Sequence, residues 1–371
     1  MRNLVFVISL LFLIGCGDGS GNNTDQVTLK ATYEIQSSFS YPASNILFDN
    51  DSLIVAGGNK ARPSGASHDG HVAFSNKVTK INLLTGTTQV LEMNAISGHG
   101  ETVANGRGDF TKINKIESNK YLISGGFQYV KNMEIADFTN ETIKSIDANF
   151  TLSDDTGSYP MIYLAEQQGN AVADSGDVFF FGYNGGLYSA DTIIKFDKTD
   201  ENISAVSKLL MSRANTTAHK LLDGRIMIIG GWDGTAEVTQ DSATRRVEIF
   251  DPTDNSIVRV ANYPEPISKG QRPEISPVTN DKICINNYEY TISQDNWNTG
   301  CSIVSDTSKV DIEKYMAFQA NPATPSHYVG TLSNGDIVMV TPASYSSTFS
   351  DELSGYPIEG PTKINVFSQE D

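Results

Sequence analysis

The chain has 371 residues, with 27 Lys or Arg against 44 Asp or Glu, so its formal net charge is −17. A chain this acidic repels phosphate backbones, which argues against general nucleic-acid binding. Hydrophobic residues make up 39% and charged residues 19%, with 31 glycines, a composition that excludes a disordered chain and is typical of a turn-rich β protein.

The N-terminus predicts an export signal. A basic start, Met1 to Asn3, precedes an apolar stretch from Leu4 to Ile14, shorter than the roughly 20 residues that cross a bilayer as a helix. The stretch ends in Leu13-Ile14-Gly15-Cys16, which resembles the lipobox of bacterial lipoproteins. The resemblance implies a signal peptide over residues 1–15, cleavage before Cys16, and acylation of that cysteine with fatty acids such as palmitate.

Residues 16–26 then form the lipidated cysteine and a flexible tether, because this segment is rich in Gly, Asn, Asp and Ser. Gly17 follows the cysteine, where by family analogy an Asp would indicate retention in the inner membrane. We therefore expect a lipid anchor in the bacterial cell envelope, in the outer membrane, with the protein facing the periplasm or the surface.

Residues 27–371 contain one motif six times. Its clearest copy is a hairpin over residues 223–231 that ends in Gly-Gly, followed by a strand from Arg246 that ends in Asp-Pro. The corresponding anchor pairs are Gly57-Gly58, Gly125-Gly126, Gly182-Tyr183, Gly230-Gly231, Asn286-Asn287 and Thr341-Pro342. They lie about 48 to 68 residues apart, near the kelch period of about 50. The pattern resembles the kelch repeat, in which each copy forms one blade of a β-propeller.

A second regularity does not depend on the glycine pairs. Six residues before each anchor stands a residue that tolerates positive φ, as a tight hairpin turn requires; these are Asp51, Asn119, Gly176, Gly224, Asn280 and Gly335. Between turn and anchor the residues are mainly apolar without alternation, which predicts strands covered on both faces.

Each copy continues with a third strand, and most continue with a fourth. The fourth strands are expected at Thr87 to Glu92, Thr142 to Ile146, Ile203 to Lys208, Ile257 to Val260 and Cys301 to Val304. The sixth copy lacks one, and the alternating segment Thr28 to Gln36 has no other place. The predicted fold is therefore an all-β, six-bladed kelch-type β-propeller whose ring is closed by an N-terminal strand that completes the last blade.

Three long loops provide candidate binding residues. In a propeller, the loops over residues 58–77, 231–245 and 342–362 would open on the same face. Polar groups mixed with aromatic ones suit a peptide or sugar ligand, and the candidates are Arg62, His68, His71, Trp232, Asp233 and Tyr345. Loop insertions without a ligand are the alternative. His68 and His71 could ligate zinc, but one such pair supplies too few ligands, so we expect no metal and no cofactor.

A second group is expected near the mouth of the central channel. Arg213 and His327 begin first strands in this reading, and Arg272 and Glu274 are placed there too. These residues could hold an anionic ligand, or they could cap strand ends and pair with each other.

The sequence leaves a disulfide open. Cys284 and Cys301 fall on the second and fourth strands of one predicted blade, about 10 Å apart at ordinary strand spacing and beyond disulfide reach. An oxidising periplasm favours the bond instead.

Two functions remain. The first is a membrane-anchored binding platform for a protein or glycan, which kelch-like propellers often provide. The alternative is a carbohydrate-acting enzyme of the epimerase or mutarotase kind, with Arg213, Arg272, Glu274 and His327 converging at the channel mouth. No motif demands an enzyme, so the sequence favours binding.

Overall fold

The computed structural model describes residues 28–37, 45–63, 74–94, 96–99, 102–108, 111–126, 132–147, 152–154, 157–159, 169–182, 190–231, 244–267, 273, 275–301, 326–348 and 355–368. Within these ranges the protein is all-β, and its regular structure consists of antiparallel sheets and one 3-10 turn, η2 (Ile292–Gln294). No helix of the described part has the length and apolar character needed to cross a membrane.

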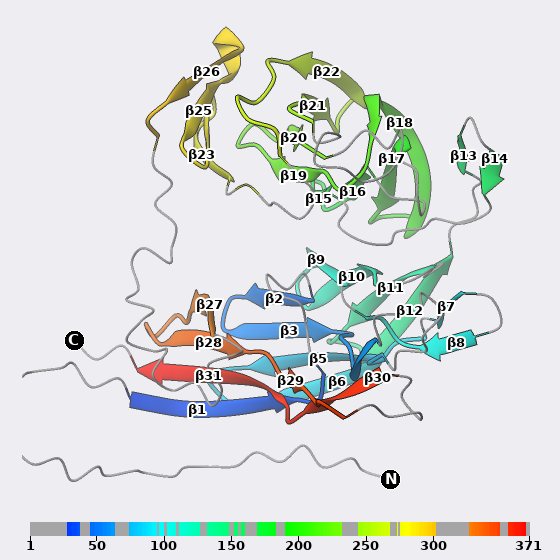
Figure 1. Cartoon of the computed structure of the whole chain (residues 1–371), viewed down its shortest axis with the longest axis vertical. Helices are drawn as coiled ribbons and strands as arrows, with labels where there is room; N and C mark the ends of the chain where they lie inside the picture. The colour runs from blue at the N-terminus through cyan, green and yellow to red at the C-terminus, as the bar shows by residue number, and fades with distance from the viewer. Residues whose placement is uncertain are drawn as a thin grey trace, which may run out of the picture.

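Most of the described strands form six four-stranded sheets, numbered here in chain order (Figure 1). The others form a three-stranded sheet and two hairpins, β7 (Ile96–His99) with β8 (Thr102–Asn105) and β13 (Leu152–Asp154) with β14 (Gly157–Tyr159). The first contains β2 (Ile46–Asp49), β3 (Ser52–Ala56), β5 (Lys77–Asn82) and β6 (Thr88–Glu92); the second contains β9 (Thr111–Glu117), β10 (Lys120–Gly125), β11 (Asn132–Asp137) and β12 (Thr142–Asp147). The third contains β15 (Gly169–Val172), β16 (Val178–Phe181), β17 (Ala190–Asp197) and β18 (Asn202–Arg213).

The remaining sheets follow the same order with one exception. The fourth contains β19 (Thr217–Lys220), β20 (Ile226–Ile229), β21 (Val247–Asp251) and β22 (Ser256–Val260); the fifth contains β23 (Ile275–Thr279), β24 (Lys282–Ile285), β25 (Tyr288–Thr291) and β26 (Asn296–Thr299). The sixth joins β27 (His327–Thr331), β28 (Ile337–Thr341) and β31 (Thr362–Ser368) to β1 (Thr28–Ile35), from the other end of the chain.

The N-terminal strand completes the last sheet, as the sequence predicts. β1 pairs antiparallel with β31 from Thr28 opposite Ser368 to Ile35 opposite Thr362, with one register shift after Leu29. Lys30 adds an ion pair to Asp336 at 2.7 Å. The outer edge of β31 is therefore covered by a strand instead of being left open.

In five of the six sheets the first anchor residue, at the end of the second strand, has the left-handed conformation that the motif predicts. Positive φ occurs at five of the six first anchor residues, with values between 52° and 69°; these are Gly57, Gly125, Gly182, Gly230 and Asn286. Asn286 replaces Gly because Asn tolerates the left-handed region better than most residues.

The predicted hairpin turns are confirmed at four of six positions, where Asn119, Gly176, Gly224 and Gly335 have positive φ. In the first hairpin the left-handed residue is Asn50 instead of Asp51. In the fifth hairpin Asn280 does not have positive φ.

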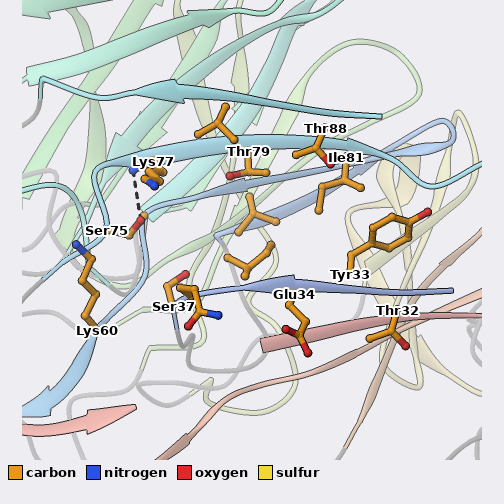
Figure 2. Close-up of a pocket in the computed structure, with 15 residues that line it drawn as sticks. Thr32, Tyr33, Glu34, Ser37, Lys60, Ser75, Lys77, Thr79, Ile81 and Thr88 are labelled. Carbon is orange, nitrogen blue, oxygen red and sulfur yellow. Dashed lines mark hydrogen bonds between the residues drawn. The ribbon is translucent and has the colours of Figure 1, made fainter. Parts of the chain in front are cut away.

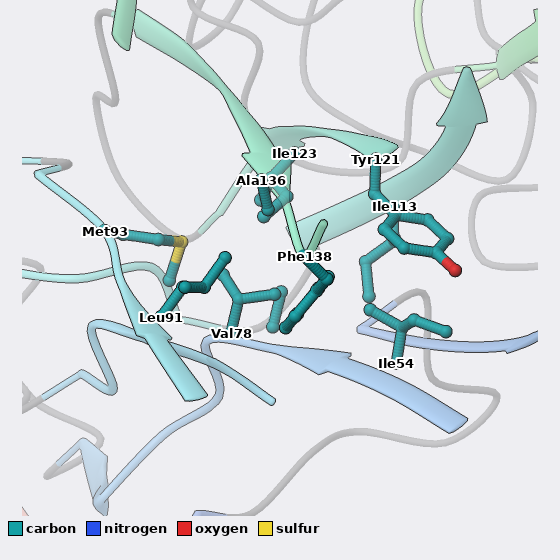
Figure 3. Close-up of a cluster of buried hydrophobic side chains, with 10 residues drawn as sticks. Ile54, Val78, Leu91, Met93, Ile113, Tyr121, Ile123, Ala136 and Phe138 are labelled. Carbon is teal, nitrogen blue, oxygen red and sulfur yellow. The ribbon is translucent and has the colours of Figure 1, made fainter. Parts of the chain in front are cut away.

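Neighbouring sheets pack through the second strands, which are apolar on both faces. Along β3, Ile54 and Ala56 join a cluster with the second sheet (Figure 3), whereas Leu53 and Val55 join a cluster with the sixth. The same alternation links the second sheet to the third, the third to the fourth, and the fourth to the fifth. Continuous apolarity in the sequence therefore has the predicted cause, which is burial on both sides of a strand.

The order of contacts runs from the sixth sheet through the first to the fifth. The remaining apolar cluster, Ile337, Met339 and Phe367 with Tyr328, belongs to the sixth sheet alone. It lies on the face of β28 opposite Val338 and Val340, which pack on the first sheet. Figure 1 shows the fifth and sixth sheets on the same side of the molecule.

Cys284 and Cys301 form a disulfide, with their Cα atoms 6.0 Å apart. The bond is possible because the expected strand at Cys301 to Val304 is misplaced. The fourth strand is β26, Asn296–Thr299, which ends before Cys301. Cys301 is therefore not held at the spacing of two strands, and the geometric objection to the bond does not apply.

Replacing both cysteines, Cys284→Ser with Cys301→Ser, should lower the free energy of unfolding by about 3 kcal/mol, as expected for a cross-link that closes a short loop. Denaturant unfolding of the variant and of the reduced wild type should agree, because both lack the same bond. Maleimide labelling of these two cysteines in denatured but unreduced protein would contradict the disulfide.

Candidate functional site

Loops from the first and sixth sheets meet in a small three-stranded sheet, with β30 (Gly355–Glu359) between β29 (Ser344–Tyr345) and β4 (Ala61–Pro63). Tyr356 lies opposite Arg62, and Ile358 lies opposite Tyr345. Arg62 and Tyr345 therefore lie on the two outer strands of this loop sheet, with Tyr356 on the strand between them. Two of the three predicted binding loops are therefore joined.

Several predicted site residues lie outside the described residues. These are the lipidation site Cys16 and the ligand candidates His68, His71, Trp232, Asp233 and Arg272, as well as Glu274. Within the described ranges, no three His, Cys, Asp or Glu side chains gather in a way that could hold a metal ion.

Arg213 does not begin a first strand near a channel mouth, and that prediction is wrong. It ends the outer strand β18, and its side chain is fully buried. Its Nη1 donates to the backbone oxygens of Gly230 at 3.1 Å and Arg246 at 2.8 Å, and its Nη2 lies 3.6 Å from Glu248. Burial lowers the pKa of Arg213 to about 10, and the charge of Glu248 opposes this shift. The guanidinium stays protonated at neutral pH, and its contacts with Glu248 and the backbone oxygens are structural contacts inside the fourth sheet.

Arg107 repeats this arrangement between the first and second sheets, two sheet interfaces earlier in the chain, a role that no sequence pattern indicates. Its side chain is fully buried, with Nε 3.1 Å from Glu134, and it donates to the backbone oxygens of Gly125 at 2.6 Å and Asn132 at 2.7 Å. Burial also lowers the pKa of Arg107, and Glu134 opposes this shift. The one available signal was the shared position of both arginines, shortly before the first strand of a sheet.

His327 begins β27, as predicted. Burial lowers its pKa, and the same cause lowers the pKa of His219 on β19. An ordinary histidine has a pKa near 6.5, so both rings are neutral at pH 7. His327 therefore provides a polar ring at this position but no positive charge for an anion.

A pocket of about 200 Å³ lies beside the loop sheet, between β1 and the outer strands of the first sheet (Figure 2). Its walls come from β1 and Ser37 on one side and from β5 and β6 on the other, with Val55, Gly57, Lys60 and Ser75 between them. Lys60 links the pocket to the loop sheet, because its backbone oxygen accepts from Ile358 N at 3.1 Å.

The strand period decides which side chains of β1 face this pocket. Tyr33 and Ile35 pack toward the first sheet, and Ser37, two residues beyond the end of β1, also lines the pocket. Figure 2 shows Tyr33 on the side of β1 toward β5 and Glu34 on the opposite side. The Tyr33 hydroxyl donates to Leu83 O at 3.3 Å, and burial raises the pKa of Tyr33.

No sequence pattern had indicated this pocket. Its residues come from β1 and from the first sheet with its connections, and β1 is placed there by pairing with β31 at the other end of the chain. The comparisons add no family: no protein-family model matches the chain, and no curated protein is similar to it.

Arg213→Met should lower the free energy of unfolding by about 3–5 kcal/mol, because it leaves Glu248 buried without its partner. Arg225→Met is the matched control, since Arg225 makes an exposed pair with Asp223 and should cost less than about 1 kcal/mol. Denaturant unfolding measures both, and equal losses in the two variants would contradict a core role for Arg213.

Proposed function

We propose that this chain is an exported, lipid-anchored β-propeller of six blades that binds a protein or glycan through its loop-rich face. The observation that carries the proposal is the loop sheet, in which the long connections of the first and sixth sheets are built into one surface. Loops on a rigid scaffold are the usual position of binding residues.

The six-bladed ring is supported by the way the sheets follow one another. Each of five successive seams is an apolar cluster shared by two neighbouring sheets. The first strands β2, β9, β15 and β19 also contact their neighbours in that order, as strands around a central axis would. In the proposed ring, the apolar face of the sixth sheet at Ile337 and Met339 meets the fifth sheet.

Export and lipid anchoring are supported by two separate features. The segment from Leu13 to Cys16 has the lipobox pattern, and the Cys284–Cys301 disulfide belongs to proteins of oxidising compartments such as the periplasm. The residue after the cysteine, Gly17, favours the outer membrane by the same family analogy.

Binding is favoured over the enzymatic alternative because one member of the proposed acid–base set is used elsewhere. That set required Arg213 and His327 to converge with Arg272 and Glu274. Arg213 is buried against Glu248 in the core of the fourth sheet, so the set as a whole is not available for an epimerase or mutarotase reaction.

Trp232→Ala should weaken binding of the protein's ligand about tenfold or more, because aromatic side chains dominate such interfaces. The measurement is a glycan array and an envelope-protein pull-down with the intact protein, followed by titration of each ligand found. Tyr345→Ala combined with Tyr356→Ala should act in the same direction.

The matched control for that experiment is Leu222→Ala, an exposed apolar side chain between β19 and β20. It lies at the end of the fourth sheet opposite the loop of Trp232, so binding should be unchanged. If the Trp232 and tyrosine variants bind the ligand as tightly as the wild type, the proposal that the loop-rich face binds it is wrong.

Cys16→Ser should abolish incorporation of a labelled fatty acid and shift the protein from the detergent phase to the aqueous phase on phase separation. The physical reason is that acyl chains, each buried in the bilayer, supply the membrane affinity. Cys284→Ser with Cys301→Ser is the control, since it removes the other two cysteines, which form the disulfide, and should leave lipidation intact. Fatty-acid labelling that persists in Cys16→Ser would contradict lipid anchoring through Cys16.

A further inference from the structure

The pocket between β1 and the first sheet contains a buried hydroxyl without a partner. Ser37 is 1% exposed, and its Oγ has no hydrogen-bond partner among the described residues. Its backbone is fixed, because Ser37 O accepts from the Thr362 hydroxyl at 2.6 Å. A buried hydroxyl without a partner is destabilising, whereas a ligand atom in the pocket would satisfy it.

Two lysines stand at the same end of the pocket. Figure 2 shows Lys60, Ser75 and Lys77 together at this end, with Ser37 nearby. Within the described residues neither Lys60 nor Lys77 has a carboxylate within 4.0 Å, although the chain carries 44 acidic residues. Nine other lysines do have one: Lys30, Lys115, Lys120, Lys144, Lys195, Lys198, Lys208, Lys220 and Lys282.

The acidic residue in the lining does not neutralise these lysines. Glu34 faces away from β5, on the opposite side of β1 from Tyr33 (Figure 2). The Ser75 hydroxyl accepts from Lys77 N at 3.3 Å and keeps its own proton to donate. This end of the pocket therefore presents two ammonium groups and two hydroxyl donors, which suits a carboxylate.

The rest of the pocket suits a hydroxylated body more than a large apolar one. Thr79 and Thr88 line it, with Val55 and Ile81 as the apolar floor. Its volume of about 200 Å³ is below the roughly 300–1,000 Å³ of sites for drug-sized ligands. A single sugar ring is of the matching size, with polar edges for threonine hydroxyls and an apolar face for the floor.

We propose that this pocket binds a sugar acid of one ring, with its carboxylate held by Lys60, Lys77 and the Ser37 hydroxyl and its ring between β1 and β5. The residues that this proposal uses differ from Trp232, Tyr345 and Tyr356, whose variants test the proposed function, so the two proposals can fail separately.

The test titrates the full chain, purified in detergent, with D-glucuronate, D-glucose and propionate, and follows binding by calorimetry. Glucuronate should bind saturably and at least about tenfold more tightly than either of the others, because only glucuronate combines the charge with the ring. Lys60→Gln with Lys77→Gln should weaken glucuronate binding at least about tenfold, and Ser37→Ala should weaken it about threefold or more.

One control separates the pocket from general charge effects. Lys208→Gln removes an exposed lysine of the third sheet that pairs with Asp191, and its binding should stay within about twofold of the wild type. Thermal unfolding verifies that every variant is folded. Equal binding of glucuronate and glucose, equal binding of propionate, no binding at millimolar concentrations, or full binding by the double lysine variant would each overturn the proposal.

Discussion

The connection from one sheet to the next passes so close over the end of the second strand that a side chain there would collide with it. A Cβ atom on Gly57 would lie 2.3 Å from the backbone oxygen of Arg107, and one on Gly182 would lie 2.7 Å from that of Arg213. The same residues have positive φ, which glycine adopts without steric cost. Both constraints act at the same point, so Gly57 and Gly182 fix where these two connections cross on their way to the second and fourth sheets.

The buried arginines bind the backbone polar groups that these connections would otherwise leave unpaired between apolar sheets. Adjacent strands separate at their loop ends, where backbone oxygens such as those of Gly125 and Asn132 would be left without ladder partners. Arg107 donates to both and is neutralised by Glu134, which also accepts from Asn94 N, just after the first sheet's outer strand. Arg213 and Glu248 do the same between the third and fourth sheets, where Glu248 accepts from Leu210 N. In each pair, the arginine donates to backbone oxygens of one sheet, and the glutamate accepts a backbone N–H from the sheet before it.

The sequence was sufficient for features set by short-range rules. The anchors, the continuous apolar second strands and the alternating N-terminal strand all reflect φ preferences or periods of burial, and the strands occur where those rules place them. Features set by long-range contacts were missed. Arg213 was placed on a first strand because nothing local shows that β18 extends to it, and the outer strand of the fifth sheet was misplaced because Asn296–Thr299 has no apolar period. The six-bladed ring and the ligands of its loops stay predictions.

The pocket lies at the interface between the first and sixth sheets. Local sequence patterns predict this interface least well, because β1 joins the sixth sheet from the opposite end of the chain. Between the first and second sheets, the large side chains of Leu91, Met93 and Phe138 fill the outer part of the seam. On the other face of β6, the corresponding positions toward β1 are Thr88 and Val90, and β5 adds Thr79. These smaller side chains cannot fill the roughly 10 Å between packed sheets. A stack selected for stability alone would place larger apolar residues there. The hydroxyl groups and the two lysines found there are instead typical of a site that binds a polar ligand.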